Sequence, residues 1–197
     1  MNEVRRLLRK APTEVQVAVA ISLILWILSQ MLPAFWGVHE YFPDMPLEGQ
    51  AVSSSPGWSL LLLGWAAPFY LLLGGAPVPI GGIIPPSSGL MFPATQFGAS
   101  LALFAWYANP LWIWTIRGLV VGERPYRAIP IASVVLALSA LQPTYLGAFD
   151  PHGVDSAIMP ALGAYVWVVA ICVPGLAAIF RVDRTASPLA GSESQPG

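Results

Sequence analysis

The chain has 197 residues, of which 56% are hydrophobic and 10% are charged, and its formal net charge is −1. Its mean hydropathy of +0.66 is far above that of a soluble domain, and so the composition excludes a soluble protein. Lys and Arg occur only beside apolar runs, which argues against a nucleic-acid partner. Cys172 is the single cysteine, so an intrachain disulfide and a thiolate metal site have no second cysteine.

We predict an all-α integral membrane protein with one polytopic domain over residues 1–184. Its first transmembrane helix should cover residues 15–34, which follow the basic sequence RRLLRK and contain no charged residue. A run of about 20 residues spans about 30 Å as a helix, the thickness of the hydrocarbon core. The run is longer than the apolar region of a signal peptide, and no small-x-small cleavage site follows it.

Residues 58–73 are predicted to form a short re-entrant helix. The sequence PGWSLLLLGWAAPFYLLLGG starts with Pro-Gly, has Pro68 in its middle and ends with two glycines. Non-helical backbone at membrane depth is tolerated where protein or water satisfies its polar groups. The Pro/Gly-rich residues 74–96 are predicted to be an apolar loop on the outer side, since prolines interrupt helices. The alternative is that residues 58–96 cross the membrane.

The second crossing is predicted at residues 97–121, with a break near its middle at Asn109-Pro110. Pro110 lacks an N–H and its ring clashes with the carbonyl of Trp106, so the helix must kink or restart. The Asn109 amide is expected to cap the restarted half-helix or to bind carbonyls freed in the 58–73 turn. A discontinuous helix that forms a substrate site is the functional alternative. Either way, the candidate structural or ligand-contacting residues are Asn109, Pro110, Trp106, Trp65 and Pro68.

The last two transmembrane helices are predicted at residues 129–149 and 157–180. Small residues recur on one face of each, and small residues let helices approach closely in lipid. We expect these two stripes to face each other, with the closest approach in the outer half. The stripe residues are Ser133, Ala137, Ala140 and Thr144 on the first helix, and Ala157, Ala161 and Ala164, followed by Val168, on the second.

The nine Lys and Arg residues define the predicted orientation. They lie before residue 15, at residues 117–127 around the inner end of the second crossing, and after Phe180, whereas the loops at 35–57 and 150–156 contain none. The positive-inside rule therefore predicts four crossings with both termini in the cytoplasm. The polar tail at residues 185–197 is predicted to be disordered.

Four motifs occur in order between residues 28 and 180: LPAFWG, PGWSLLLLGW, AWYANPL and GAYVWVVA. In this order they resemble the LPAF, PGWxLLLLGW, WxANPL and YxxW elements of a family of small uncharacterised bacterial inner-membrane proteins. The resemblance implies an inner-membrane location and this architecture, but no activity. Residues 74–96 are an insertion relative to that family.

The sequence contains no hydrolase, redox or phosphate-binding motif, and its ionisable residues lie at or beyond the predicted membrane edges. His39 and His152, together with acidic residues of the outer loops, could bind a divalent metal. Their spacing fits no known ligand motif. We therefore predict solvated loops without a metal or cofactor. We expect a non-enzymatic accessory, assembly or interaction subunit, with the lipid bilayer and other membrane subunits as partners. The alternative is binding or translocation of a small apolar or lipid-like ligand at residues 58–116, which a pocket reaching Asn109 would favour.

Overall fold

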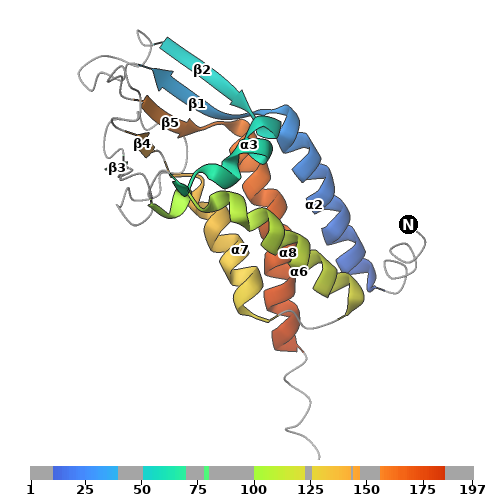
Figure 1. The fold of residues 1–197 in the computed structure, drawn as a ribbon. Coiled ribbons are helices and arrows are strands. Elements are labelled where there is room, and N and C mark those ends of the chain that lie inside the picture. Colours follow the sequence, from blue (N-terminus) through green and yellow to red (C-terminus); the bar gives the residue numbers. More distant parts are fainter. Residues whose placement is uncertain are drawn as a thin grey trace, which may run out of the picture.

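The computed structural model describes residues 11–39, 51–69, 78–79, 100–122, 126–142, 144–146 and 156–184. They form a helical body with a small sheet at one end (Figure 1). The predicted 185–197 tail, and the predicted outer loop apart from Val78–Pro79, lie outside the described residues. The helices are α2 (Thr13–Met31), α3 (Gly57–Leu63), α6 (Ala108–Val121), α7 (Ala128–Ser139) and α8 (Leu162–Arg184), with 3-10 helices η2 (Gly64–Ala66) and η4 (Ala105–Tyr107).

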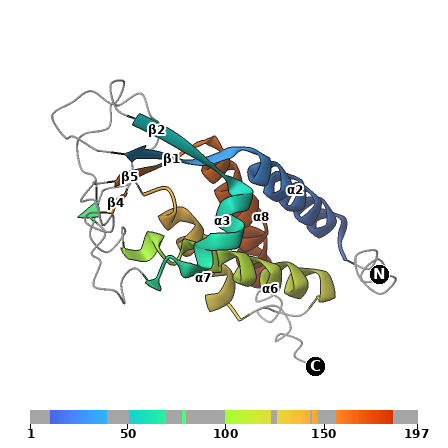
Figure 2. The ribbon, with the colours of Figure 1, turned by 45° about the horizontal axis from the view of Figure 1, so that its top comes forward.

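The predicted helical character of the protein is confirmed, and α8 is central to the helical body. It packs against α2, α6 and α7, and it lies between α2 and α7 (Figures 1 and 2). Two helical segments, Thr13–Met31 and Leu162–Phe180, are long and apolar enough to cross a membrane. In contrast, α6 has 14 residues and α7 has 12, which correspond to about 21 Å and about 18 Å of helix. The described helices therefore do not confirm four full-length crossings.

A small antiparallel sheet replaces the ends of the last two predicted helices. The predicted 129–149 helix ends at Ser139, and the 157–180 helix begins at Leu162. Pro143 cannot donate a helical N–H, and Pro160 biases the residue before it toward extended backbone. Hydropathy misses these breaks because it registers only that a residue is apolar. The all-α prediction is therefore wrong in this part of the chain.

The five strands of the sheet have the order β2-β1-β5-β4-β3. Strand β1 attaches the sheet to the helical body, because it follows α2 and pairs with both β2 and β5, with Trp36 opposite Met159. The backbone N–H of Ala161 also donates to the carbonyl of Ala34 at 2.8 Å. The sheet thus joins the end of α2 to the start of α8. The strands are β1 (Pro33–His39), β2 (Ala51–Pro56), β3 (Val78–Pro79), β4 (Thr144–Leu146) and β5 (Ser156–Pro160).

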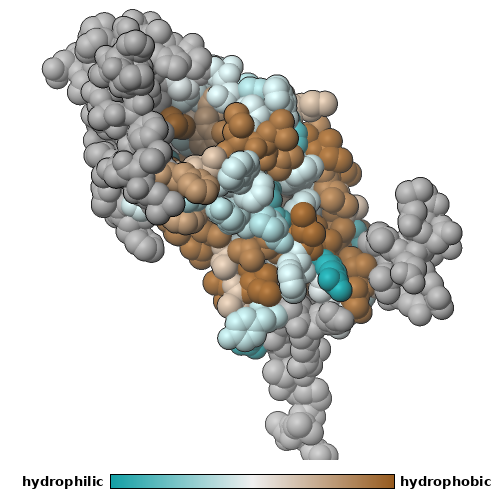
Figure 3. Space-filling view, in the orientation of Figure 1, coloured by the Kyte–Doolittle hydropathy of each residue, from teal (hydrophilic) through white to brown (hydrophobic). Residues whose placement is uncertain are grey.

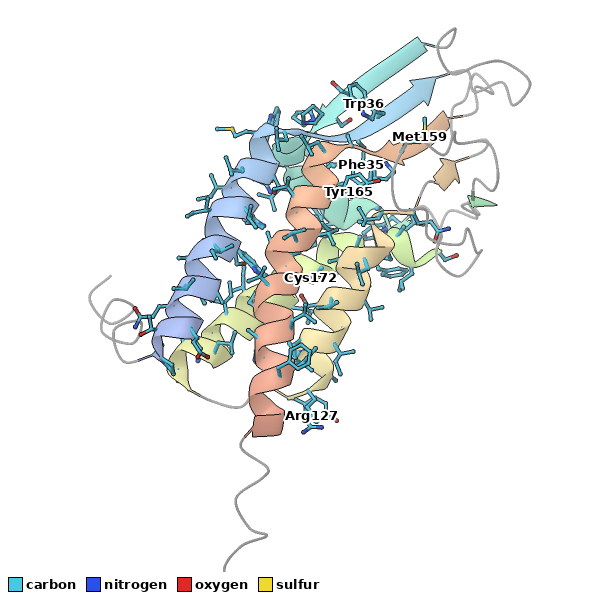
Figure 4. All side chains as sticks on the ribbon, turned by 180° about the vertical axis from the view of Figure 1, so that it is seen from behind. Phe35, Trp36, Arg127, Met159, Tyr165 and Cys172 are labelled. Carbon is cyan, nitrogen blue, oxygen red and sulfur yellow. The ribbon has the colours of Figure 1, made fainter. Side chains whose placement is uncertain are left out.

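The start of α2 and the ends of α6 and α8 lie together at the end of the molecule opposite the sheet. A buried cluster of Ala11, Val15, Val19, Leu119 and Ala178 joins these three segments. Figure 4 shows Arg127 at this end and Trp36 and Met159 at the other. The segments that border the three basic clusters of the sequence therefore share one end of the fold.

The predicted packing of the last two helices is confirmed in part. Ala137 of α7 lies in one buried cluster with Ala164 and Val168 of α8. However, the Ser133 hydroxyl donates to the Ala108 carbonyl at 3.3 Å and so faces α6, and Thr144 and Ala157 lie on strands. A further close approach lies nearer the Arg127 end: a Cβ added to Gly175 would be 2.6 Å from Cγ2 of Val134.

Candidate functional site

Asn109 lies at the start of α6, but it does not cap that helix as predicted. The N-cap is Tyr107, and α6 begins at Ala108 after the 3-10 turn of η4. The Asn109 side-chain nitrogen instead donates to the carbonyl of Trp106 at 3.1 Å. In a continuous helix the Trp106 carbonyl would accept from the N–H of residue 110, but Pro110 has no N–H to donate. The break therefore comes before Asn109, and the amide compensates the carbonyl that Pro110 leaves free.

The Asn109 side-chain oxygen accepts hydrogen bonds from two tryptophans on other helices. Nε1 of Trp26 on α2 lies 3.2 Å from Oδ1, and Nε1 of Trp167 on α8 lies 3.0 Å from it. Because an indole N–H can only donate, these contacts fix which end of the amide is the oxygen. Asn109, which is 8% exposed, thus joins α2, α6 and α8. Both tryptophans lie within predicted spans, but no sequence pattern indicated that they would bind Asn109.

A second buried contact chain runs between the same helices. The indole N–H of Trp112 donates to Ser22 Oγ at 2.8 Å, and the Ser22 hydroxyl donates to the Ala170 carbonyl. Trp112 also stacks on Trp26, with ring centroids 5.6 Å apart. The polar groups at this level are therefore paired with one another, as buried polar groups require in lipid or protein.

Trp106 and Tyr107 attach the α3–η2 segment to the helical body. The Trp106 indole donates to the Leu61 carbonyl at 2.8 Å, and the Tyr107 hydroxyl donates to the Trp65 carbonyl at 3.4 Å. Trp65 itself is half exposed and packs edge-on against Phe69. Trp106 and Tyr107, rather than Asn109, thus reach the 58–73 segment, of which residues 58–69 are described.

A cavity of about 470 Å³ lies between the sheet end of α2, the α3–η2 segment, η4 and the start of α8. Asn109 and Trp106 line it, whereas the other three predicted site residues, Trp65, Pro68 and Pro110, do not. Much of the lining is glycine and alanine, whose small size leaves the space open. None of the described lining residues is Asp, Glu, Lys, Arg or His.

Gln30, near the end of α2, is one of the polar residues that line the cavity. Its side-chain nitrogen donates to Ser29 Oγ at 3.0 Å and to the Trp26 carbonyl at 3.3 Å. Its side-chain oxygen is buried and has no hydrogen-bond partner among the described residues. No pattern in the sequence singles out this residue, because a glutamine near a helix end is ordinarily solvated.

The acidic and histidine residues considered as an outer metal site lie largely outside the described residues, and so does the side chain of His39. Within the part of the chain that the structure describes, no group of three or more His, Cys, Asp or Glu residues could hold a metal ion. Comparisons of the chain with protein-family models, with curated proteins and with solved structures find no match.

Proposed function

We propose that this protein binds a small apolar or lipid-like molecule in the cavity beside Asn109, within a polytopic membrane domain. The observation that carries the proposal is the cavity itself, which has a volume of about 470 Å³ and reaches Asn109 from the α3–η2 side. Binding sites for small molecules have volumes of about 300–1,000 Å³ and mostly apolar walls. Of the two functions expected from the sequence, the cavity favours ligand binding over an accessory subunit.

The exposed side of α2 supports a membrane location. Large apolar side chains are exposed along the whole helix, with Ile24 58% exposed and Ile27 56% exposed. Figure 3 shows apolar residues along this flank of the helical body. Soluble monomers rarely expose so large a continuous apolar surface, whereas lipid tails solvate it without cost. The same holds for Ile113 and Trp114 of α6.

In the proposed orientation, the end with the basic clusters faces the cytoplasm and the sheet faces the outer side. The shared location of the start of α2 and the ends of α6 and α8 supports this orientation, because one membrane face then receives all three basic clusters. The helices α2, α6, α7 and α8 would make the four crossings, and the motif resemblance points to a bacterial inner membrane. Topology reporters fused after Lys10 and after Arg184 should both give the cytoplasmic signal. Opposite signals would overturn the orientation.

An accessory or assembly subunit without enzymatic activity is the second candidate. Exposed aromatic side chains on the α3–η2 side, namely Trp58 and the contacting pair Trp65 and Phe69, favour it, because such groups are common where partner proteins bind. Native purification in mild detergent distinguishes the two candidates. A stoichiometric protein partner that buries these aromatic side chains would support the subunit, and a retained apolar molecule without such a partner would support ligand binding.

Filling the cavity tests ligand binding directly. Ala102 lines the cavity and is half-buried, so Ala102→Phe can place its ring in the open space without displacing packed core. We expect the variant to fold and to lose bound apolar molecules by about tenfold or more, a change of about 1.4 kcal/mol or more in binding free energy. Native mass spectrometry of the purified protein measures retained lipid.

Val135→Phe is the matched control for Ala102→Phe. Val135 lies on α7, is 46% exposed and does not line the cavity. This variant should retain bound molecules as the wild type does. Equal retention by both variants, or a wild-type protein that binds no apolar probe, would contradict the proposed function.

A further inference from the structure

We propose that the cavity selects an uncharged amphiphile whose head group donates a hydrogen bond, such as a long-chain or isoprenoid alcohol, and that Gln30 is the acceptor. This inference rests on the proposed function and names the ligand class. Three observations carry it: the absence of charge among the described lining residues, an acceptor oxygen without a donor, and the position of that oxygen in the fold.

The described part of the lining disfavours charged head groups. No described lining residue is Asp, Glu, Lys, Arg or His. An ion placed in such a cavity loses its hydration and finds no counter-charge, which costs far more than apolar contacts return. Fatty acids and phospholipid head groups therefore fit poorly. Neutral polar groups remain, because one or two hydrogen bonds are enough to compensate their burial.

The local hydrogen bonds show that the unpaired atom of Gln30 is an acceptor. The Ser29 hydroxyl donates to the Trp26 carbonyl at 2.6 Å, so its single hydrogen is already used. Ser29 Oγ can then only accept, and the Gln30 atom 3.0 Å away must be the amide nitrogen. That nitrogen uses its second hydrogen on the Trp26 carbonyl. The other side-chain atom of Gln30 is consequently a carbonyl oxygen, and no donor in the described part of the chain reaches it.

An apolar ligand that carries one hydrogen-bond donor suits this oxygen better than a water molecule does. A buried water needs about two to four polar partners, whereas much of this cavity wall is apolar, including Leu60, Leu103 and Ile158. A ligand hydroxyl supplies the one missing donor, and its chain covers the apolar wall. The oxygen has less than 1 Å² exposed, so a ligand hydroxyl reaches it only when the amide turns about its terminal torsion, a soft rotation in glutamine. The turn must be small enough to keep the two hydrogen bonds of the amide nitrogen.

The position of Gln30 also suits an amphiphile. Gln30 precedes the last residue of α2, and the neighbouring Met31 is highly exposed. In the proposed membrane orientation this end of α2 lies at the outer interface. An alcohol bound there keeps its hydroxyl near the depth at which lipid head groups begin, and its chain extends into the protein rather than into the bilayer.

Three matched probes test the inference with the full-length protein in lipid nanodiscs. Farnesol carries the donor, its methyl ether keeps the oxygen but has no donor, and farnesene has no polar group. The wild type should bind farnesol about tenfold more tightly than either analogue, because only the alcohol pairs the buried acceptor. Gln30→Met, which keeps the length of the side chain, should remove this preference, so that the three probes bind this variant with similar affinities.

Gln16→Met is the control for the substitution itself. Gln16 lies on the same helix, donates to the Ala11 carbonyl and does not line the cavity, so this variant should keep the preference for the alcohol. Equal binding of all three probes to the wild type would overturn the inference while leaving the proposed function intact. A preference for the alcohol that persists in Gln30→Met would overturn it in the same way. If none of the probes binds, both the inference and the proposed function fail.

Discussion

Gly57→Ala is expected to prevent the protein from reaching its folded state in useful amounts. The Gly57 N–H donates to the Leu32 carbonyl at 3.1 Å, which places the start of α3 directly on the end of α2. A Cβ at this position would overlap the Ser29 carbonyl oxygen and lie 2.9 Å from Cα of Gln30. Because both obstacles are backbone atoms, neither can be relieved by a side-chain rotation. The cost should therefore exceed the usual penalty for overpacking, at about 3 kcal/mol or more.

The measurement for Gly57→Ala is the yield of monodisperse protein and its melting temperature in detergent. Gly122→Ala serves as the control, because Gly122 has a φ of 79° but no atom of the described residues lies within 4 Å of an added Cβ. That variant should lose only about 1–2 kcal/mol, the cost of a left-handed backbone for a residue with a side chain. Equal losses in the two variants would show that α3 does not dock on α2 as described.

Asn109→Leu is expected to cause the second large loss of stability. The substitution keeps a similar side-chain volume but leaves two indole N–H groups, those of Trp26 and Trp167, without partners, and it removes the amide donor of the Trp106 carbonyl. Hydrogen bonds between helices in lipid contribute about 0.6–1.7 kcal/mol each. The two bonds from the tryptophans, with the local bond to the Trp106 carbonyl counted at a similar value, predict a loss of about 2–5 kcal/mol. Unfolding by SDS in mixed micelles measures the free energy.

A double-mutant cycle identifies the hydrogen bond as the cause. Trp167→Phe removes one of the two donors and should destabilise the wild type by about 1 kcal/mol. In the Asn109→Leu background the same change removes a donor that is already unpaired, so its cost should be clearly smaller. Ser139→Ala, which loses only a local bond to the Leu136 carbonyl, should cost less than Asn109→Leu. Additive losses from Asn109→Leu and Trp167→Phe would contradict the proposed network.

Features that depend on neighbouring residues along the chain could be predicted from the sequence. Uninterrupted apolar runs are sufficient to predict α2 and α8, and they do so because a helix satisfies its own backbone while its side chains meet lipid or other helices. Pro110 likewise made an interruption near Asn109 predictable, since its missing N–H is a property of that residue alone. The grouping of Lys and Arg could also be read directly from the chain.

The hydrogen bonds that connect the interrupted segments to distant residues could be identified only in the folded molecule. The Asn109 oxygen meets tryptophans 83 and 58 residues away, and Trp106 meets a carbonyl 45 residues away. Strand pairing between β1 and β5 joins a segment near the start of the chain to one that is more than 100 residues later. No periodicity encodes these contacts, because hydropathy records whether a residue is apolar and not which donor meets which acceptor. The cavity follows for the same reason: it is the space left where short helices, small residues and the sheet meet, and that space exists only once the elements are assembled.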